Sequence, residues 1–509
     1  MKTTEYILSI DQGTTGTRAG LVNHEGNLVG SKYQEIKQYY PFPGWVEQDP
    51  FEILESVYIT IKLLMEEFQI KPQSIISMGI ANQRESTVIW DKNSGKPIYN
   101  AIVWQCRRTT EACKQIKNKG LSEKIKRITG LTVDPYFSAT KICWILDNVS
   151  GARELADKGS LAFGTIDSWL VWNLTKNTQH LMDVSNASRT MLFDINQLKW
   201  SHDILDILSI PSSMMPEIVP SNGKLATISG IPFNIPSLSL NGIAGDQQSA
   251  LFGQCCFDAG TVKVTYGTGA FILINTGKKL VHSEGLLTTV AWSLDGEISY
   301  ALEGGVFSAG STIQWLRDEL KIIETSNEIE ELSSTVQDNG GVYFVPAFNG
   351  LGTPYWDPEA RGTIQGLTRG SNGGHIAKAA IESIAFQCDE VINLMVNESK
   401  ISIKDLKADG GASVNNSLMQ FQSDISGFEI QRSYTPETTL LGAAYLSGIG
   451  IGFWKNIDEL IGKWKSSGDF YPLMKQDKRD RLRLNWKKAV ERSLPVSYTH
   501  LTLPTNREV

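Results

Sequence analysis

The segment Tyr6-Ile-Leu-Ser-Ile-Asp-Gln-Gly-Thr-Thr-Gly16 decides the fold, because its apolar run leads directly into a turn rich in glycine and threonine. The apolar half, residues 6–10, predicts a buried strand. A second strand is predicted over residues 17–22, and a third begins at residue 27 after another turn. The chain therefore opens as an antiparallel meander, and not as a strand followed by a helix.

The glycine-rich turn has the composition of an anion site. Glycines let the backbone approach a phosphate closely, and successive N–H groups and threonine hydroxyls can then donate to its oxygens. Asp11 precedes the turn and can hold Mg²⁺, usually through water, since magnesium keeps part of its hydration shell. Arg18, across the predicted hairpin, can add positive charge to a transferring phosphate. An ordinary hairpin turn is the alternative explanation of the same residues.

Two parts of this pattern recur in the second half of the chain. Residues 10–17 resemble residues 264–271, and residues 79–86 resemble residues 242–249. Chance similarity between short glycine-rich segments is one explanation. A consistent repeat instead predicts two related domains that face each other, and we place them at residues 1–253 and 254–495. Each domain would contribute one phosphate-binding turn, with Gly267-Thr268-Gly269 as the second. The P-loop, protein-kinase and Rossmann motifs are absent.

The rest of the chain alternates between helical and extended patterns, which is typical of the α/β class. Apolar residues at helical spacing predict helices over residues 50–68, 111–128 and 139–148. Strands are predicted over residues 74–81 and 239–244.

Composition excludes several classes of protein. The 509 residues are 41% hydrophobic and carry a net charge of −7, which indicates a globular chain and argues against a nucleic-acid partner. No apolar run reaches the roughly 18 residues that span a membrane, and the first residues lack a signal-peptide pattern. The six cysteines are scattered without a CxxC pair. We therefore expect a cytoplasmic protein without a membrane span.

Four places near the predicted strand ends contain residues that could take part in catalysis or ligand binding. Asp246 could accept a proton from a hydroxyl that attacks phosphorus, although it could equally be a helix N-cap. Arg84 and Glu85 could hold the hydroxyls of a polyol, or form a surface ion pair. Trp104 and Tyr136 could line a carbon chain, or simply pack in the core. A turn at residues 408–416 could let a flat ring stack on bare backbone.

Together these segments resemble the FGGY family of carbohydrate kinases, most closely its glycerol-phosphorylating branch. The resemblance extends from about residue 6 to about residue 493. The matching words are long and specific: Asp11-Gln-Gly-Thr-Thr15, Pro43-Gly-Trp-Val-Glu-Gln-Asp-Pro50, Asn82-Gln-Arg-Glu85, Asn100-Ala-Ile-Val-Trp-Gln-Cys-Arg-Arg-Thr109, Asp134-Pro-Tyr-Phe137, Asn186-Ala-Ser-Arg-Thr-Met191, Gly245-Asp-Gln-Gln248, Thr265-Tyr-Gly-Thr-Gly269, Gly352-Thr-Pro-Tyr-Trp-Asp-Pro358 and Asp409-Gly-Gly411.

The resemblance implies two actin-like domains of ribonuclease-H-like topology, flanking a nucleotide and substrate cleft that closes and excludes water. It implies transfer of the γ-phosphoryl group of Mg·ATP to a terminal hydroxyl of glycerol, giving glycerol 3-phosphate. Relatives form dimers and tetramers, so it also implies a homodimer or homotetramer. Residues 220–241 contain neither arginine nor histidine, and we therefore expect neither the fructose 1,6-bisphosphate control nor the histidine phosphorylation of some relatives.

The resemblance also assigns roles to individual residues. Asp246 would be the general base and Asp11 would support Mg²⁺. The remaining roles are hydroxyl binding by Arg84, Glu85, Tyr136, Asp246 and Gln247; walls for the carbon chain from Trp104 and Phe271; phosphate binding by Thr14, Thr15, Arg18 and Thr268; and the nucleoside side from Gly310, Gln314, Gly411 and Asn415.

Two alternatives remain open at this point. A kinase of the same family could act on a ketopentose or a related polyol, and a non-catalytic ATPase could share the fold. The last residues, 496–509, resemble translated adapter sequence, and we expect them to be a non-native, disordered tail.

Overall fold

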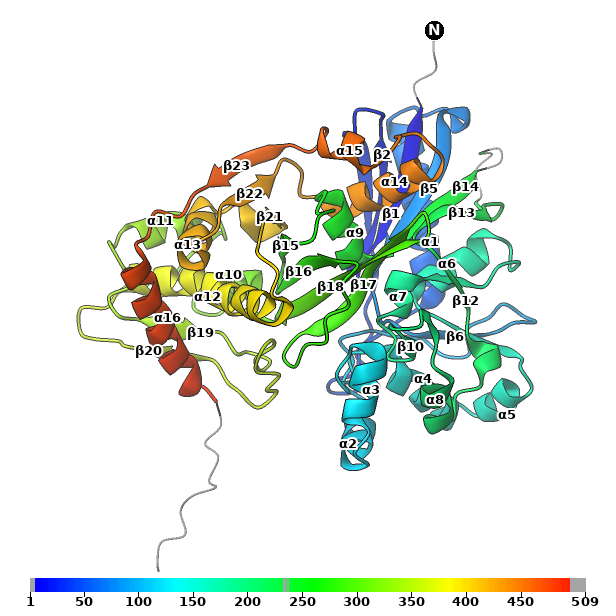
Figure 1. The fold of residues 1–509 in the computed structure, drawn as a ribbon, viewed down its shortest axis with the longest axis horizontal. Coiled ribbons are helices and arrows are strands. Elements are labelled where there is room, and N and C mark those ends of the chain that lie inside the picture. The colour runs from blue at the N-terminus through cyan, green and yellow to red at the C-terminus, as the bar shows by residue number, and fades with distance from the viewer. Residues whose placement is uncertain (1–4, 232–234, 236–237, 495–509) are drawn as a thin grey trace, which may run out of the picture.

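The computed structural model describes residues 5–231, 235 and 238–494. Two large mixed sheets dominate it, one from each half of the chain, and they lie on opposite sides of Figure 1. The predicted tail, residues 496–509, lies outside the described residues, as does part of the segment 220–241.

The first sheet has the strand order β13-β14-β5-β1-β2-β3. β1, β2 and β3 are antiparallel neighbours, which confirms the predicted meander, and β5 and β14 continue the sheet in parallel with β1. The strands of this sheet are β1 (Tyr6–Gln12), β2 (Gly16–Val22), β3 (Leu28–Glu35), β5 (Ile75–Asn82), β13 (Asn222–Thr227) and β14 (Ser239–Gly245).

Helices cover both faces of this sheet. Leu8 and Ile10 of β1 belong to the core formed with α1 and α6, whereas Ile7 belongs to a core shared with α9 and α14. This alternation follows from the period of two along a strand. The helices of the first half are α1 (Pro50–Glu67), α2 (Thr110–Asn118), α3 (Ser122–Thr129), α4 (Ser138–Asn148), α5 (Ala152–Asp157), α6 (Ile166–Leu174), α7 (Val184–Ala187), α8 (His202–Ile207) and α9 (Asp246–Gly253).

One predicted helix of this half is wrong. Residues 111–128 form the two helices α2 and α3 and not a single one. Gly120 lies between them with a φ of +71°, a conformation that interrupts a right-handed helix and that glycine adopts at little cost. Short strand pairs complete this half: β4 (Glu47–Gln48) with β7 (Ala101–Ile102), β6 (Val88–Asp91) with β8 (Leu161–Gly164), β9 (Leu181–Asp183) with β12 (Glu217–Val219), and β10 (Phe193–Asp194) with β11 (Lys199–Trp200).

The second sheet has the order β17-β18-β16-β15-β21-β22-β23. Its strands are arranged as in the first sheet, because β15 and β16 form an antiparallel hairpin and β15 pairs in parallel with β21. Its strands are β15 (Thr261–Tyr266), β16 (Ala270–Gly277), β17 (Leu287–Leu294), β18 (Glu297–Val306), β21 (Asp405–Asp409), β22 (Ile430–Ser433) and β23 (Ser466–Phe470), and a separate pair joins β19 (Tyr343–Val345) to β20 (Thr363–Gln365).

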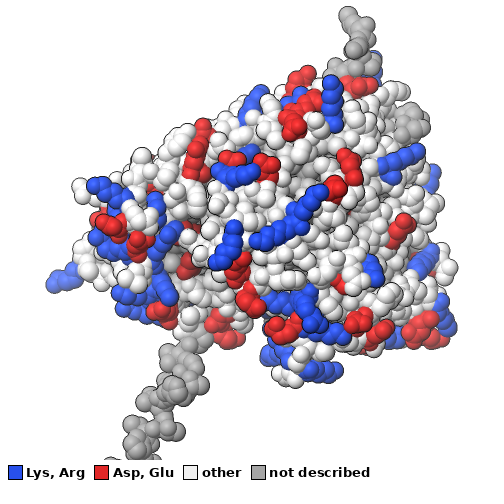
Figure 2. Space-filling model, viewed as in Figure 1, with Lys and Arg blue, Asp and Glu red and all other residues white. Residues whose placement is uncertain are grey.

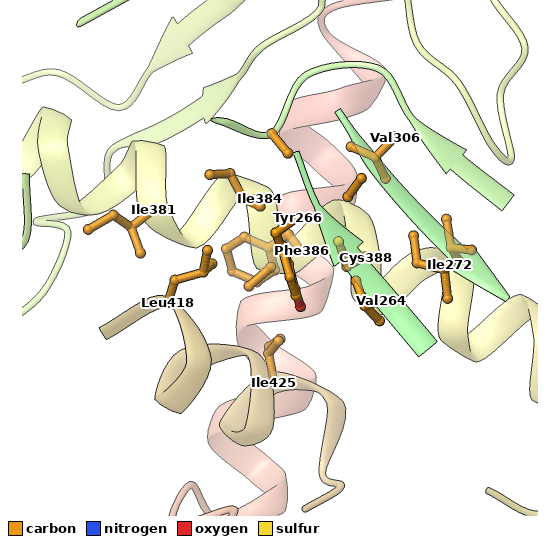
Figure 3. Close-up of a cluster of buried hydrophobic side chains, with 14 of the residues drawn as sticks. Val264, Tyr266, Ile272, Val306, Ile381, Ile384, Phe386, Cys388, Leu418 and Ile425 are labelled. Carbon is orange, nitrogen blue, oxygen red and sulfur yellow. The ribbon is translucent and has the colours of Figure 1, made fainter. Parts of the chain in front are cut away.

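The core of this half lies between the sheet and its long helices. Figure 3 shows Val264 and Tyr266 of β15 facing Ile384 and Phe386 of α12, with Leu418 of α13 beside them. The helices of the second half are α10 (Gly310–Asp318), α11 (Glu328–Ser334), α12 (Gly373–Ser399), α13 (Asn416–Ser426), α14 (Thr438–Gly450), α15 (Ile457–Ile461) and α16 (Gln476–Glu491).

One helix of the second half packs on the sheet of the first. α14 lies against α9 and against β1, β5 and β14 (Figure 1). The approach is close enough to need glycine, because a Cβ built on Gly442 would lie 1.8 Å from the carbonyl oxygen of Ser249. The two sheets are therefore joined by α9 and α14, which share one hydrophobic core with both of them.

Charged side chains of both signs lie side by side on one face of the molecule (Figure 2). On the face shown in Figure 2, lysine and arginine alternate with aspartate and glutamate over the described residues. No helix of the described part of the chain is long and apolar enough to cross a membrane.

Candidate active site

Three parallel strands of the first sheet deliver the predicted site residues to one edge. Asp11 of β1 and Ala244 of β14 both pair with Ala81 of β5, one from each side. Arg84 follows β5 and Asp246 follows β14 within a few residues, so both side chains emerge beside Asp11 at the carboxyl ends of the strands. Ligands bind at such ends in open α/β sheets.

Arg84 is buried, and each nitrogen of its guanidinium group lies near an oxygen atom of a neighbouring side chain. Its Nη1 and Nη2 donate to Glu303 Oε2 and Oε1 at 2.5 and 3.0 Å. Its Nε lies 3.1 Å from Asp246 Oδ1, and weaker contacts join Nη1 to Gln248 Oε1 at 3.2 Å and Nη2 to the Tyr136 hydroxyl at 3.4 Å. The guanidinium group is thus held in one orientation between the general-base candidate and an unpredicted carboxylate.

Glu85 does not form a surface ion pair with Arg84, so that alternative is wrong. Both side chains are at most 3% exposed, and the closest contact between them is 3.9 Å. Glu85 Oε1 instead accepts a hydrogen bond from Arg189 Nε at 2.7 Å. Glu85 also adopts a φ of +60°, a costly conformation for a non-glycine residue that often marks a functional position.

Asp246 is not the N-cap of α9, which corrects the other structural alternative. Gly245 occupies the N-cap and Asp246 is the first helical residue, with its Oδ1 accepting from the Gln247 amide at 2.6 Å. Its side chain remains 27% exposed. Burial raises the pKa of Asp246, and Arg84 and Lys263 oppose that rise. A carboxylate with a raised pKa and an open face suits proton acceptance.

Gln247 is held from the second sheet. Lys263, fully buried in β15, donates from Nζ to Gln247 Oε1 at 2.6 Å and to Thr265 Oγ1 at 2.9 Å. Burial lowers the pKa of Lys263. Because the amide oxygen of Gln247 is occupied, its NH₂ group is the part left to donate to a ligand.

Three half-buried aromatic side chains gather next to these polar groups. The ring of Trp104 meets Tyr136 edge to face at 5.5 Å and Phe271 at 6.4 Å between centroids. Trp104 Nε1 also donates to Thr14 Oγ1 at 2.8 Å. These rings are not fully buried in the core, and Trp104 links the aromatic cluster directly to the first glycine turn.

Asp11 is the residue predicted to support a metal ion. Burial, together with the negative charges of Asp246 and Glu437, raises the pKa of Asp11 to about 8 against the pull of Arg18. The described residues contain no cluster of three or more histidine, cysteine, aspartate or glutamate side chains suited to a metal. Two carboxylates that repel each other fit Mg²⁺, which takes oxygen ligands and is commonly held by one or two carboxylates together with substrate phosphates.

The first phosphate turn is a tight hairpin, with the Gly13 amide donating to the Gly16 carbonyl at 2.9 Å. Thr15 is exposed at its tip, and the Tyr33 hydroxyl donates to Thr15 Oγ1 at 3.2 Å. Arg18 is paired across the hairpin with Asp11, and its Nε lies 3.1 Å from Glu437 Oε2. In this structure Arg18 is thus tied to the start of α14.

The second turn and the predicted nucleoside side share the ends of β15 and β21. The carbonyl of Thr268 accepts from the Ser311 amide at 3.0 Å, which places this turn against the start of α10. Gly310 is required there, since a Cβ would lie 2.6 Å from the Gly267 carbonyl oxygen. Gln314 is exposed one turn further along α10, and Gly411 is exposed at the end of β21. Asn415 Oδ1 caps α13 by accepting from the Leu418 amide at 2.8 Å, so its NH₂ group is the part left for a ligand.

Sequence reasoning missed three buried charges of this site: Arg189, Lys263 and Glu303. Arg189 and Glu303 are joined to each other, with Arg189 Nη2 donating to Glu303 Oε1 at 3.0 Å. The sequence did contain one signal. Lys263 and Glu303 each interrupt an apolar stretch of a strand, and a charged side chain that is buried there needs a partner.

Both halves of the chain match known proteins. Residues 6–253 match the N-terminal domain of the FGGY family of carbohydrate kinases, and residues 262–451 match its C-terminal domain. The chain is 54% identical over 491 residues to the glycerol kinase of Caldanaerobacter subterraneus subsp. tengcongensis, covering 96% of this chain and 99% of that protein. It is 53% identical to glycerol kinase 2 of Thermotoga maritima, with the same coverage.

Solved structures show the same fold. The glycerol kinase of Plasmodium falciparum with ADP matches with a TM-score of 0.91 at 38% identity, covering 97% of this chain and 99% of that one. A xylulose kinase of Lactobacillus acidophilus matches with a TM-score of 0.84 at 22% identity, covering 96% and 97%. The predicted pair of actin-like domains is confirmed. The chain belongs to the FGGY family of carbohydrate kinases.

Proposed function

We propose that the protein transfers the γ-phosphoryl group of ATP to a terminal hydroxyl of glycerol, giving glycerol 3-phosphate and ADP. Relatives named as glycerol kinases cover nearly the whole chain at 52–55% identity. The single observation that carries the proposal is the contact of Asp246 Oδ1 with Arg84 Nε at 3.1 Å, beside an aromatic cluster at the ends of the strands.

Asp246 is the general base of this reaction. The terminal O–H of glycerol attacks the γ-phosphorus, its proton moves to the Asp246 carboxylate, and the bond from the γ-phosphorus to the bridging oxygen of ADP breaks. The pairing with Arg84 orients the carboxylate, while burial keeps it basic enough to accept the proton. The partial exposure of Asp246 leaves one side of the carboxylate free for the substrate.

The groups around Asp246 match the chemistry of a small triol. Arg84, Tyr136 and the Gln247 NH₂ group donate to hydroxyl oxygens, and the carboxylate of Glu85 accepts. Trp104 and Phe271 provide apolar surface for the three-carbon chain.

The phosphates of ATP are held by the two glycine turns, through Thr14, Thr15, Arg18 and Thr268. The nucleoside side is formed by Gly310, Gln314, Gly411 and Asn415 at the ends of α10, β21 and α13. When Mg²⁺ is bound it neutralises phosphate charge, and Asp11 would hold it, because its carboxylate lies at the strand end beside the first glycine turn and near the carboxylate of Asp246.

A coupled assay of ADP release tests the proposal, with glycerol, xylulose, ribulose and gluconate each offered at a range of concentrations. We expect the highest kcat/KM with glycerol. A higher kcat/KM with a ketopentose would overturn the substrate assignment in favour of another kinase of the same family. ATP binding without turnover of any of these substrates would point to a non-catalytic ATPase.

A further inference from the structure

Glu303 lies at the centre of a buried charge cluster that joins the two halves of the chain. It belongs to β18 of the second sheet, yet its carboxylate accepts from Arg84 at 2.5 and 3.0 Å and from Arg189 at 3.0 Å. Arg84 follows β5 of the first sheet, so these bonds connect residues 219 positions apart. Glu303 and Arg189 are both at most 1% exposed.

The position of Glu303 along β18 directs it toward the substrate site. Side chains two residues apart on a strand share a face, and Glu303 shares its face with Gly305. Gly305 pairs with Phe271 across β16 and β18, and a Cβ on Gly305 would lie 3.6 Å from the Phe271 ring. Glu303 therefore stands on the side of the second sheet that carries the aromatic wall of the site.

The cluster is balanced only when Glu303 is ionised. Arg84 and Arg189 carry two positive charges, and Glu85 and Glu303 carry two negative ones. Burial raises the pKa of Glu303, but Arg189 and Arg84 overcome this and bring it to about 2. Among the described residues, Arg189 Nη1 is already buried without a hydrogen-bond partner. Without the charge of Glu303, Arg84 would keep Asp246 and Glu85 as neighbouring carboxylates, and Arg189 would keep only Glu85.

We propose that Glu303 is a positioning residue for glycerol: its two-pronged contact fixes the guanidinium plane of Arg84, so that Arg84 presents Nε to Asp246 and the Nη2 N–H that makes only a 3.4 Å contact with Tyr136 to the substrate. The proposal rests on the proposed function, since it assigns Glu303 to the binding of that substrate. A bidentate contact sets the plane of a guanidinium group in a way that a single contact does not. Glu303 does not touch the reacting atoms itself, and acts through Arg84.

The variant Glu303→Gln keeps the size of the side chain and removes its charge. We expect the KM for glycerol to rise about tenfold or more, while the KM for ATP stays within about twofold. The matched control is Asp389→Asn in α12, because Asp389 is another buried carboxylate in a two-pronged contact, with Arg483 at 2.7 Å for both bonds. Asp389→Asn should lower the melting temperature without changing the KM for glycerol.

A double-variant cycle distinguishes positioning from a general structural role. If Glu303 acts through Arg84, Glu303→Gln should reduce kcat/KM for glycerol much less in an Arg84→Ala background than in the wild type. An equal reduction in both backgrounds would overturn the proposal. So would a Glu303→Gln protein that folds and keeps the wild-type KM for glycerol.

Glu303→Asp covers the case in which Glu303→Gln does not fold. It keeps the buried charge and shortens the reach by one methylene, so it should fold and still raise the KM for glycerol. An unchanged KM in this variant would also overturn the proposal. The wild-type assay separates the two levels of inference: failure of the wild type to phosphorylate glycerol contradicts the proposed function, whereas wild-type activity with unaffected Glu303 variants contradicts only the role of Glu303.

Discussion

Lys263 Nζ lies 2.6 Å from Gln247 Oε1, so a buried cation of the second sheet fixes the orientation of an amide at the start of α9. The bond spans the join between the two sheets. It also places a positive charge near Asp246, whose pKa it helps to keep down. Through Lys263, as through Glu303, the second sheet helps to shape a site whose principal side chains follow the first.

Replacing Lys263 by methionine should weaken glycerol binding. Without the cation, the Gln247 amide is free to rotate, and its NH₂ group is no longer held toward the substrate. We expect kcat/KM for glycerol to fall about tenfold, which corresponds to the contribution of one hydrogen bond to a charged group. The matched control is Lys407→Met, since Lys407 pairs in register with Lys263 but donates to the Gln254 carbonyl. Steady-state kinetics of the two variants should differ, and an equal loss in both would contradict the role of Lys263.

Replacing Asp246 by asparagine should remove the base and keep the fold. We expect kcat to fall by roughly 10²–10⁴-fold, the usual contribution of general-base catalysis. Binding of ATP, measured by calorimetry, should persist, because the two glycine turns are untouched by the change. Turnover at the wild-type rate would exclude Asp246 from the mechanism.

Glu382 should make the stability of the protein depend on pH. It is buried in α12, where burial raises its pKa to about 7, opposed by a hydrogen bond from Asn339 Nδ2 at 2.8 Å. The unfolded chain releases this proton near pH 4.5, the ordinary value for glutamate. Between these two values the folded state binds more protons, so the free energy of unfolding falls as the pH rises, by at most about 3 kcal/mol from this group.

Glu382→Gln isolates this contribution, because the glutamine oxygen can still accept from Asn339 while the titration is lost. Urea unfolding of both proteins should give similar free energies near pH 4.5 and a more stable variant at pH 8. A difference that stays constant over this range would show that Glu382 does not titrate as described.

The local parts of the fold were predictable, and the long-range parts were not. The apolar run before Asp11 and the glycine turn after it predicted the opening hairpin, because both signals lie within a few residues of each other. The same holds for Asp246 at the end of β14. The partners of Arg84 could not be found in this way, since Glu303 and Arg189 come from distant segments and no local pattern ties either of them to β5.

The helix predicted over residues 111–128 failed for a different reason. Its apolar spacing continued across Gly120, and the pattern alone gave no weight to a backbone conformation that ends a helix. In the site, Asn415 is predicted as a ligand partner; its side-chain oxygen also caps α13, so its NH₂ group is the part left for that role. Whether a polar side chain is already hydrogen-bonded within the protein can be seen only when the positions of its neighbours are known.

The packing of α14 against the first sheet determines when that sheet can complete its folding during synthesis. Ile7 and Ala244 share their core with Leu441 and Ala444, so this face of the first sheet is only partly covered, by α9, until the ribosome has made nearly the whole chain. The first half of the protein thus cannot complete its folding as an independent unit while the rest is being translated. Nascent chains arrested before Thr438 should remain sensitive to protease within the first sheet, and those released after Gly450 should become resistant. Until α14 has been synthesised, the apolar face that it will cover is the part of the nascent chain where a chaperone would be needed most.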